Sequence, residues 1–212
     1  MNGQGKPVVP PGCRRILDVG CGDGGGLMEA GVPDDDFIVA TDLNWEALQA
    51  CREKFPSISL VCSSAEQLPY RTGAFDAYLA RSAWPYTNLR QSTGEAFRVL
   101  AAGGSLWVTA RTASTAFVWW RTSLRKRYLH GVLFNTYTIV NGAFLHVTGR
   151  NFRFPFRWSG MSRYESFQTR RSLHGLLRRA GFDGIQIVRR NFFEVTATKA
   201  GEQVYIKEQT QI

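Results

Sequence analysis

A cluster of glycines follows the first apolar segment of the chain, in the order Asp18-Val-Gly20-Cys-Gly22-Asp-Gly24-Gly-Gly. Glycines at the end of a strand permit a tight turn into a helix and let a ligand lie close to the backbone. Asp42 stands eighteen residues after Gly24, where a second strand is expected to end. A carboxylate at this point can accept both hydroxyl protons of a ribose. The two features predict a nucleoside-binding site and leave open which nucleoside cofactor it binds.

The elements that must position these residues alternate between strand and helix patterns. This alternation is typical of βαβ units and of a mainly parallel sheet. Helices are expected over Leu27–Ala30, after an N-cap at Asn44, after a capping box formed by Ser92 and Glu95, and near Ser166–Ala180. We expect strands over Arg14–Val19, Phe37–Thr41, Ile58–Val61, Phe75–Ala80, Ser105–Ala110, Ile185–Arg190 and Phe193–Lys199.

Four ordered blocks of this sequence resemble the class I S-adenosylmethionine-dependent methyltransferases, and most of all the type 11 branch. The blocks read ILDVGCGDG, ATDLN, CSSAEQLPYRTGAFDAYLARSAW and EAFRVLAAGGSLWVTA, and they span about Arg14 to Ala110. The resemblance implies an α/β fold, a Rossmann-like three-layer sandwich with a mainly parallel seven-stranded sheet and an antiparallel last strand. A single domain is expected over residues 1–212, with a core at 14–110 and 166–200 and an insertion at about 111–165.

The resemblance implies S-adenosyl-L-methionine as the cofactor and gives the matching residues their roles. Asp18 would hold the amino group of the methionine part, which would lie against the loop containing Gly20, Cys21, Gly22 and Gly24. A carboxylate at Asp18 also favours this cofactor over NAD, because dinucleotide-binding chains usually have an apolar residue there. The remaining candidates are Asp42 for the ribose, Leu43 for the adenine, the triplet Ser64, Ala65 and Glu66 after the third strand, and Arg81 beside the expected position of the reactive methyl.

Positive charge is concentrated in the second half of the chain. Before Arg111 there are nine basic and twelve acidic residues, and from Arg111 onwards there are seventeen basic and five acidic residues. Such asymmetry favours an anionic partner. Phe117, Trp120, Leu124 and Tyr128 would share one helical face near several arginines. The insertion could therefore be a packed substrate lid, an amphipathic helix at a membrane surface, or an RNA-binding surface.

Methyl transfer by in-line displacement depends mainly on alignment and on the exclusion of water. A general base is needed only when the nucleophile arrives protonated. The candidates are His146 first, then His130 and Tyr137, although each is also an ordinary packing residue for an aromatic segment. We expect no metal site, because Cys13, Cys21, Cys51 and Cys62 lack a CxxC spacing and a neighbouring histidine.

These observations predict a methyltransferase that acts on a small-molecule or lipid-like acceptor, which can be anionic. The alternatives are an RNA methyltransferase that uses the basic half, with nucleic acid the less favoured partner, and a non-catalytic binding protein with a cofactor fold. The first residues carry no signal-peptide pattern, so a cytoplasmic location is expected, with peripheral membrane contact through the insertion. The sequence does not determine the oligomeric state.

Overall fold

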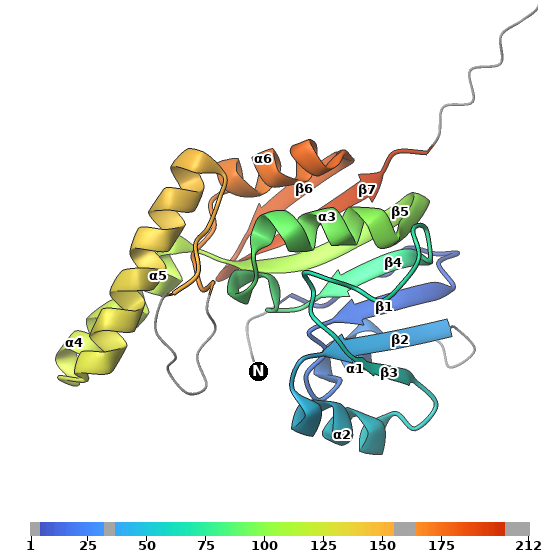
Figure 1. Ribbon diagram of the computed structural model, residues 1–212, viewed down its shortest axis with the longest axis horizontal. Coiled ribbons are helices and arrows are strands. Elements are labelled where there is room, and N and C mark those ends of the chain that lie inside the picture. Colours follow the sequence, from blue (N-terminus) through green and yellow to red (C-terminus); the bar gives the residue numbers. More distant parts are fainter. Residues whose placement is uncertain (1–4, 32–36, 155–163, 202–212) are drawn as a thin grey trace, which may run out of the picture.

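The computed structural model describes residues 5–31, 37–154 and 164–201, which form a sheet covered by helices (Figure 1). The seven strands lie in the order β3-β2-β1-β4-β5-β7-β6. Only β7 runs antiparallel to its neighbours, which confirms the predicted Rossmann-like sheet with an antiparallel last strand. The strands are β1 (Arg15–Val19), β2 (Phe37–Asp42), β3 (Ser59–Cys62), β4 (Phe75–Ala80), β5 (Leu100–Arg111), β6 (Phe182–Arg189) and β7 (Phe192–Lys199).

Both faces of the central strands are buried. In β1, Ile16 packs with Leu48 on one side of the sheet, while Leu17 packs with Leu176 on the other. This double burial explains why Ile16 and Leu17, which point to opposite faces of the sheet, are both apolar. The helices are α1 (Gly25–Ala30), α2 (Trp45–Lys54), α3 (Leu89–Val99), α4 (Ala113–Arg125), α5 (Leu129–Thr148) and α6 (Arg170–Ala180), with a short 3-10 helix at Trp84–Tyr86.

Two expected helix starts are wrong. The N-cap of α3 is Asn88, whose side chain accepts a hydrogen bond from the Gln91 amide, and Ser92 lies inside the helix. Glu95 does not close a capping box, because it accepts a hydrogen bond from the Leu68 amide and pairs with Arg98. The last helix begins only after Thr169, which forms the capping box with Ser172.

The insertion contains two helices where one was expected. The chain turns between α4 and α5 at Arg127, which has a left-handed backbone with φ of 50°. Tyr128 is the N-cap of α5, so it does not continue the face of α4 as predicted. Figure 1 shows the pair beside the sheet at the end to which β1 and β4 point. Residues 155–163 of the insertion lie outside the described residues.

Candidate functional site

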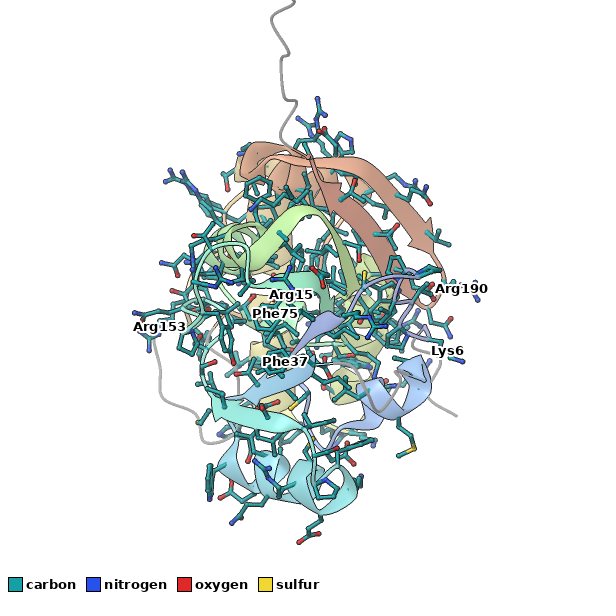
Figure 2. The ribbon with its side chains drawn as sticks, turned by 90° about the vertical axis from the view of Figure 1, so that its right-hand side faces the viewer. Lys6, Arg15, Phe37, Phe75, Arg153 and Arg190 are labelled. Atoms are coloured by element: carbon teal, nitrogen blue, oxygen red, sulfur yellow. The ribbon has the colours of Figure 1, made fainter. Side chains whose placement is uncertain are left out.

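A cavity of about 750 Å³ opens at the carboxyl ends of the central strands, where open α/β sheets bind ligands. Figure 2 views the molecule from the opposite end, with Arg15, Phe37 and Phe75 at the starts of β1, β2 and β4, and with Arg153 at one side. The cavity is lined by Val19, Gly20, Asp42, Leu43, Ser63, Ser64, Ala65, Glu66, Arg81, Ser82, Ala83, Tyr86, Thr87, Arg153 and Tyr164.

The glycine loop reaches the cavity through Gly20 and is hydrogen-bonded to the end of β2. The amides of Gly20 and Cys21 donate to the carbonyl of Thr41 at 2.7 and 3.1 Å. Gly20, Gly22 and Gly24 have φ values of 69°, 56° and 84°, a region that only glycine adopts at little cost. At Gly20 a Cβ atom would lie 2.4 Å from Cβ of Ala83, so the loop also needs glycine for close packing.

Asp42 is held in place by the backbone on both sides of it. Its two carboxylate oxygens accept hydrogen bonds of 2.9 Å from the amides of Gly22 and Asn44. These bonds fix the carboxylate at the cavity wall and leave lone pairs for a ligand's hydroxyl groups. Leu43 follows with an exposed side chain that also lines the cavity. A fixed carboxylate beside an apolar surface is an arrangement that suits a nucleoside.

Asp18 is almost completely buried beneath the glycine loop. Burial raises the pKa of Asp18 to about 7, although the nearby positive charge of Arg81 acts in the opposite direction. Within the described residues Oδ2 of Asp18 has no hydrogen-bond partner. An unsatisfied buried oxygen is costly, so this atom favours a ligand that brings a cationic donor. The residues present therefore fit the ammonium group of an amino-acid-bearing cofactor.

Arg81 reaches from the end of β4 to the start of α1. Its guanidinium forms an ion pair of 2.7 Å with Glu29 and lies against Gly25. The side chain thus lines the cavity on the α1 side, where it can bind a ligand's carboxylate. The sequence had placed it beside the reactive methyl.

The triplet after β3 forms a further wall. Ser64 accepts a hydrogen bond from the amide of Glu66 at 3.2 Å, and the Glu66 carboxylate accepts one from the amide of Asn88 at 2.6 Å. Glu66 thereby connects the loop after β3 to the start of α3. All three predicted residues, Ser64, Ala65 and Glu66, line the cavity, whereas the predicted residues Asp18, Cys21, Gly22 and Gly24 are not part of its lining.

Several cavity residues were not predicted. Ser82 has a left-handed backbone with φ of 64°, and its buried Oγ has no hydrogen-bond partner within the described residues. Tyr86 lies above it, and its hydroxyl accepts a hydrogen bond of 2.9 Å from Arg111. Both follow the end of β4, which was predicted, so the rule that ligands bind beyond strand ends could have found them. Arg153 and Tyr164 carry no comparable signal.

None of the three candidate bases lines this cavity. Nδ1 of His146 lies 2.9 Å from the hydroxyl of Thr169, the N-cap of α6. His130 is exposed at the start of α5 and stacks on Tyr128. Tyr137 is buried, donates to the carbonyl of Phe152 at 2.8 Å, and has its pKa raised by burial. Their role as bases stays a prediction, and each has a structural contact of its own.

The cysteines show no ligand geometry. Cys21 and Cys51 are buried and Cys62 is exposed, and no disulfide links the cysteines within the described residues. Burial raises the pKa of Cys21, so this thiol stays protonated. Across residues 5–31, 37–154 and 164–201 no three side chains of His, Cys, Asp or Glu are grouped so that they could hold a metal ion. In the same part of the chain no helix is long and apolar enough to span a bilayer.

Comparison with known proteins finds sequence similarity over the first half of the chain. Residues 17–108 match a family model described as a methyltransferase domain. An uncharacterized methyltransferase of Mycobacterium tuberculosis is 31% identical over 130 residues, which cover 56% of this chain and 52% of the relative. A phthiotriol/phenolphthiotriol dimycocerosates methyltransferase of Mycobacterium ulcerans is 31% identical over 117 residues, covering 52% and 42% of the two chains. This chain thus spans about half the length of the curated relatives it matches.

The fold extends further than the sequence similarity. A SAM-dependent methyltransferase from Methanosarcina mazei superposes with a TM-score of 0.61 at 21% identity, covering 92% of this chain and 95% of that one. At this identity the likeness concerns the fold. It includes the region beyond residue 108, where the sequence match ends.

Proposed function

Because the chain carries a class I methyltransferase domain, whose cofactor is S-adenosylmethionine, we propose that it transfers a methyl group from this cofactor to a small, lipid-like acceptor. The domain is the one that the four sequence blocks predicted. The observation that carries the proposal is the pair of acids at neighbouring strand ends. Asp18 has a buried oxygen with no hydrogen-bond partner among the described residues, and Asp42 has an oriented carboxylate at the cavity wall.

In this proposal each end of the cofactor has its own residues. Asp18 binds the ammonium group and Arg81 the carboxylate of the methionine part. Asp42 binds the ribose hydroxyls and Leu43 packs on the adenine, with Ser64 as a hydrogen-bonding residue at the same wall. When bound, the cofactor supplies an electrophilic methyl group. The contribution of this chain is to orient the acceptor and to exclude water.

The acceptor would enter from the side of Tyr86, Arg153 and Tyr164. Aromatic rings suit a lipophilic acceptor, and Arg153 suits one that bears negative charge. Tyr86 is held by Arg111, so its hydroxyl has a fixed position at the cavity wall. A lipid-like acceptor is further supported by the relative named after dimycocerosate lipids, although the similarity covers only part of both chains.

Calorimetric titration tests this function. S-adenosylmethionine should bind the wild-type chain at micromolar concentrations, whereas NAD should not. Asp42→Ala should lose the binding, because the ribose hydroxyls lose their acceptor. Asp23→Ala is the matched control, since Asp23 lies in the same loop but pairs with Lys54 at the surface. Absence of cofactor binding to the wild-type chain, or equal losses in both variants, would reject the proposal.

A further inference from the structure

Helix α5 has an exposed apolar stripe along its whole length. Leu129, Leu133, Val140, Phe144 and Val147 are spaced so that they share one face of the helix. Each of these five side chains is between 42% and 79% exposed. At a rise of about 1.5 Å per residue, the stripe is roughly 27 Å long. Exposed apolar surface of this extent marks an interaction site.

Helix α4 widens this stripe. The indole of Trp120 donates a hydrogen bond of 3.0 Å to Thr136, which lies within the stripe on α5. Phe117 and Leu124 are the neighbours of Trp120 one turn before and after it, and both are exposed. We call these residues of α4 and α5 together the apolar face.

Cations flank the apolar face, and acids are absent from its sequence. No Asp or Glu occurs between Glu95 and Glu165. Arg121, Arg125, Lys126 and Arg127 surround the connection between the two helices, and all four are exposed. At the other end of α5, a cavity of about 690 Å³ is bordered by Phe144 of the apolar face and by Arg90, Arg150 and Arg179.

We propose that the apolar face docks onto an anionic lipid bilayer, with α5 lying in the interfacial plane. A helix that is apolar on one side and flanked by Lys and Arg has the composition of such interfacial helices. The opposite side of α5 packs through Tyr137 and Asn141, so the helix lies on the bilayer and does not cross it. A second copy of the chain would bring like-charged groups together. Nucleic acid would meet leucine and valine at four of the five stripe positions on α5, where it needs stacking aromatic rings.

The docking face and the cofactor cavity are connected through α5. On the inner side of this helix, Asn141 donates to the carbonyls of Phe152, Tyr164 and Glu165 at 3.0 to 3.3 Å. The segments that it holds contain Arg153 and Tyr164 of the cavity wall. Docking would therefore hold the acceptor side of the cavity near the membrane, with α5 between the two. The docking itself does not depend on methyl transfer, so the two proposals fail separately.

Vesicle sedimentation tests the docking. The full chain should bind vesicles of phosphatidylglycerol and phosphatidylcholine in equal parts, and not vesicles of phosphatidylcholine alone, and binding should weaken as salt is added. Val140→Glu and Leu133→Glu should each reduce binding at least about tenfold, because a charge replaces a buried apolar contact. Val188→Glu on β6 is the matched control, since Val188 is about as exposed as Val140 but lies away from the apolar face. The control should bind like the wild-type chain.

Three outcomes would overturn the proposal. The first is sedimentation of Val140→Glu with anionic vesicles to the same extent as the wild-type chain. The second is a dimer in light scattering that dissociates in Val140→Glu, which would assign the apolar face to a second copy. The third is single-stranded RNA binding that is lost in Arg121→Gln/Arg125→Gln while vesicle binding is absent. Circular dichroism and cofactor titration of each variant show that it is folded, so a loss of sedimentation reports on the docking face.

Discussion

Arg111 and Glu165 form an ion pair at the point where the insertion leaves and rejoins the sheet. Both side chains are almost completely shielded from water, and the guanidinium also lies over the ring of Trp119 at 4.5 Å. The same guanidinium donates to the hydroxyl of Tyr86. One buried pair thus connects the end of β5, the middle of α4 and the wall of the cavity.

Breaking this pair should strongly reduce stability. Glu165→Gln leaves the Arg111 charge buried without its partner, and we expect a loss of about 3–5 kcal/mol in the free energy of unfolding. Asp183→Asn is the control, because the Arg178–Asp183 pair is exposed and should contribute less than about 1 kcal/mol. Urea titration of both variants measures the difference. Equal losses would show that Arg111 finds another partner.

Asp18 should make the ligand-free protein less stable as the pH rises. Burial raises its folded-state pKa to about 7, against an ordinary value near 4 in the unfolded chain. Between these values the folded state holds the proton and the unfolded state releases it. The free energy of unfolding therefore falls from about pH 4 to about pH 7 and is level above that.

Asp18→Asn removes this dependence. At pH 8 the ligand-free variant should be more stable than the wild-type chain, by at most about 4 kcal/mol, while its affinity for S-adenosylmethionine should fall. Urea unfolding at pH 5 and pH 8 measures the first effect and calorimetry the second. The idea is wrong if the variant and the wild-type chain show the same change in stability between the two pH values.

Gly20→Ala should lower the free energy of unfolding by more than its backbone angle alone explains. Gly12 and Gly20 have φ values of 87° and 69°, but only a Cβ at Gly20 meets another atom, 2.4 Å away on Ala83. We expect Gly12→Ala to cost about 1 kcal/mol and Gly20→Ala to cost more and to weaken cofactor binding. The double variant Gly20→Ala/Ala83→Gly should recover part of both losses. No recovery would place the cause in the backbone angle.

His146→Ala should lower stability and leave the turnover number unchanged. The imidazole lies beside the N-cap hydroxyl of α6 and does not line the cavity. Loss of this support should cost about 1 kcal/mol or less. Thermal unfolding and a pH profile of methyl transfer distinguish the two roles. A fall in turnover with an altered pH profile would instead establish His146 as the base that the sequence suggested.

The strand ends and the glycine loop of the proposed cofactor site could be located from the sequence because their signals are local. Asp18 and Asp42 lie at the ends of their strands. The three predicted loop glycines between them have positive φ values, which other residue types adopt only at a cost. The acceptor side could not be predicted in this way. Arg153 and Tyr164 reach the cavity because Tyr137 and Asn141 hold the chain after α5, and no sequence spacing announces such tertiary hydrogen bonds.

The starts of the helices also could not be predicted from local sequence alone. Ser92 and Glu95 fit a capping box by type and spacing, but Asn88 offers an earlier cap and Glu95 has stronger partners in Leu68 and Arg98. The insertion was recognised by composition, yet its division into two helices depends on the turn at Arg127. Local patterns therefore located the elements, and long-range contacts decided their ends.

The two ends of the insertion lie side by side in space, at Arg111–Thr112 and at Gln168. They form a single junction between the insertion and the sheet. Thr112 and Gln168 form an isolated β-bridge. The Gln168 amide donates to the Arg111 carbonyl, and the Arg111 amide donates to the Gln168 side-chain oxygen, both at 2.7 Å. A segment anchored in this manner can be exchanged or lengthened while the sheet keeps its register. The junction thus separates the segment proposed to meet the acceptor from the sheet end proposed to bind the cofactor.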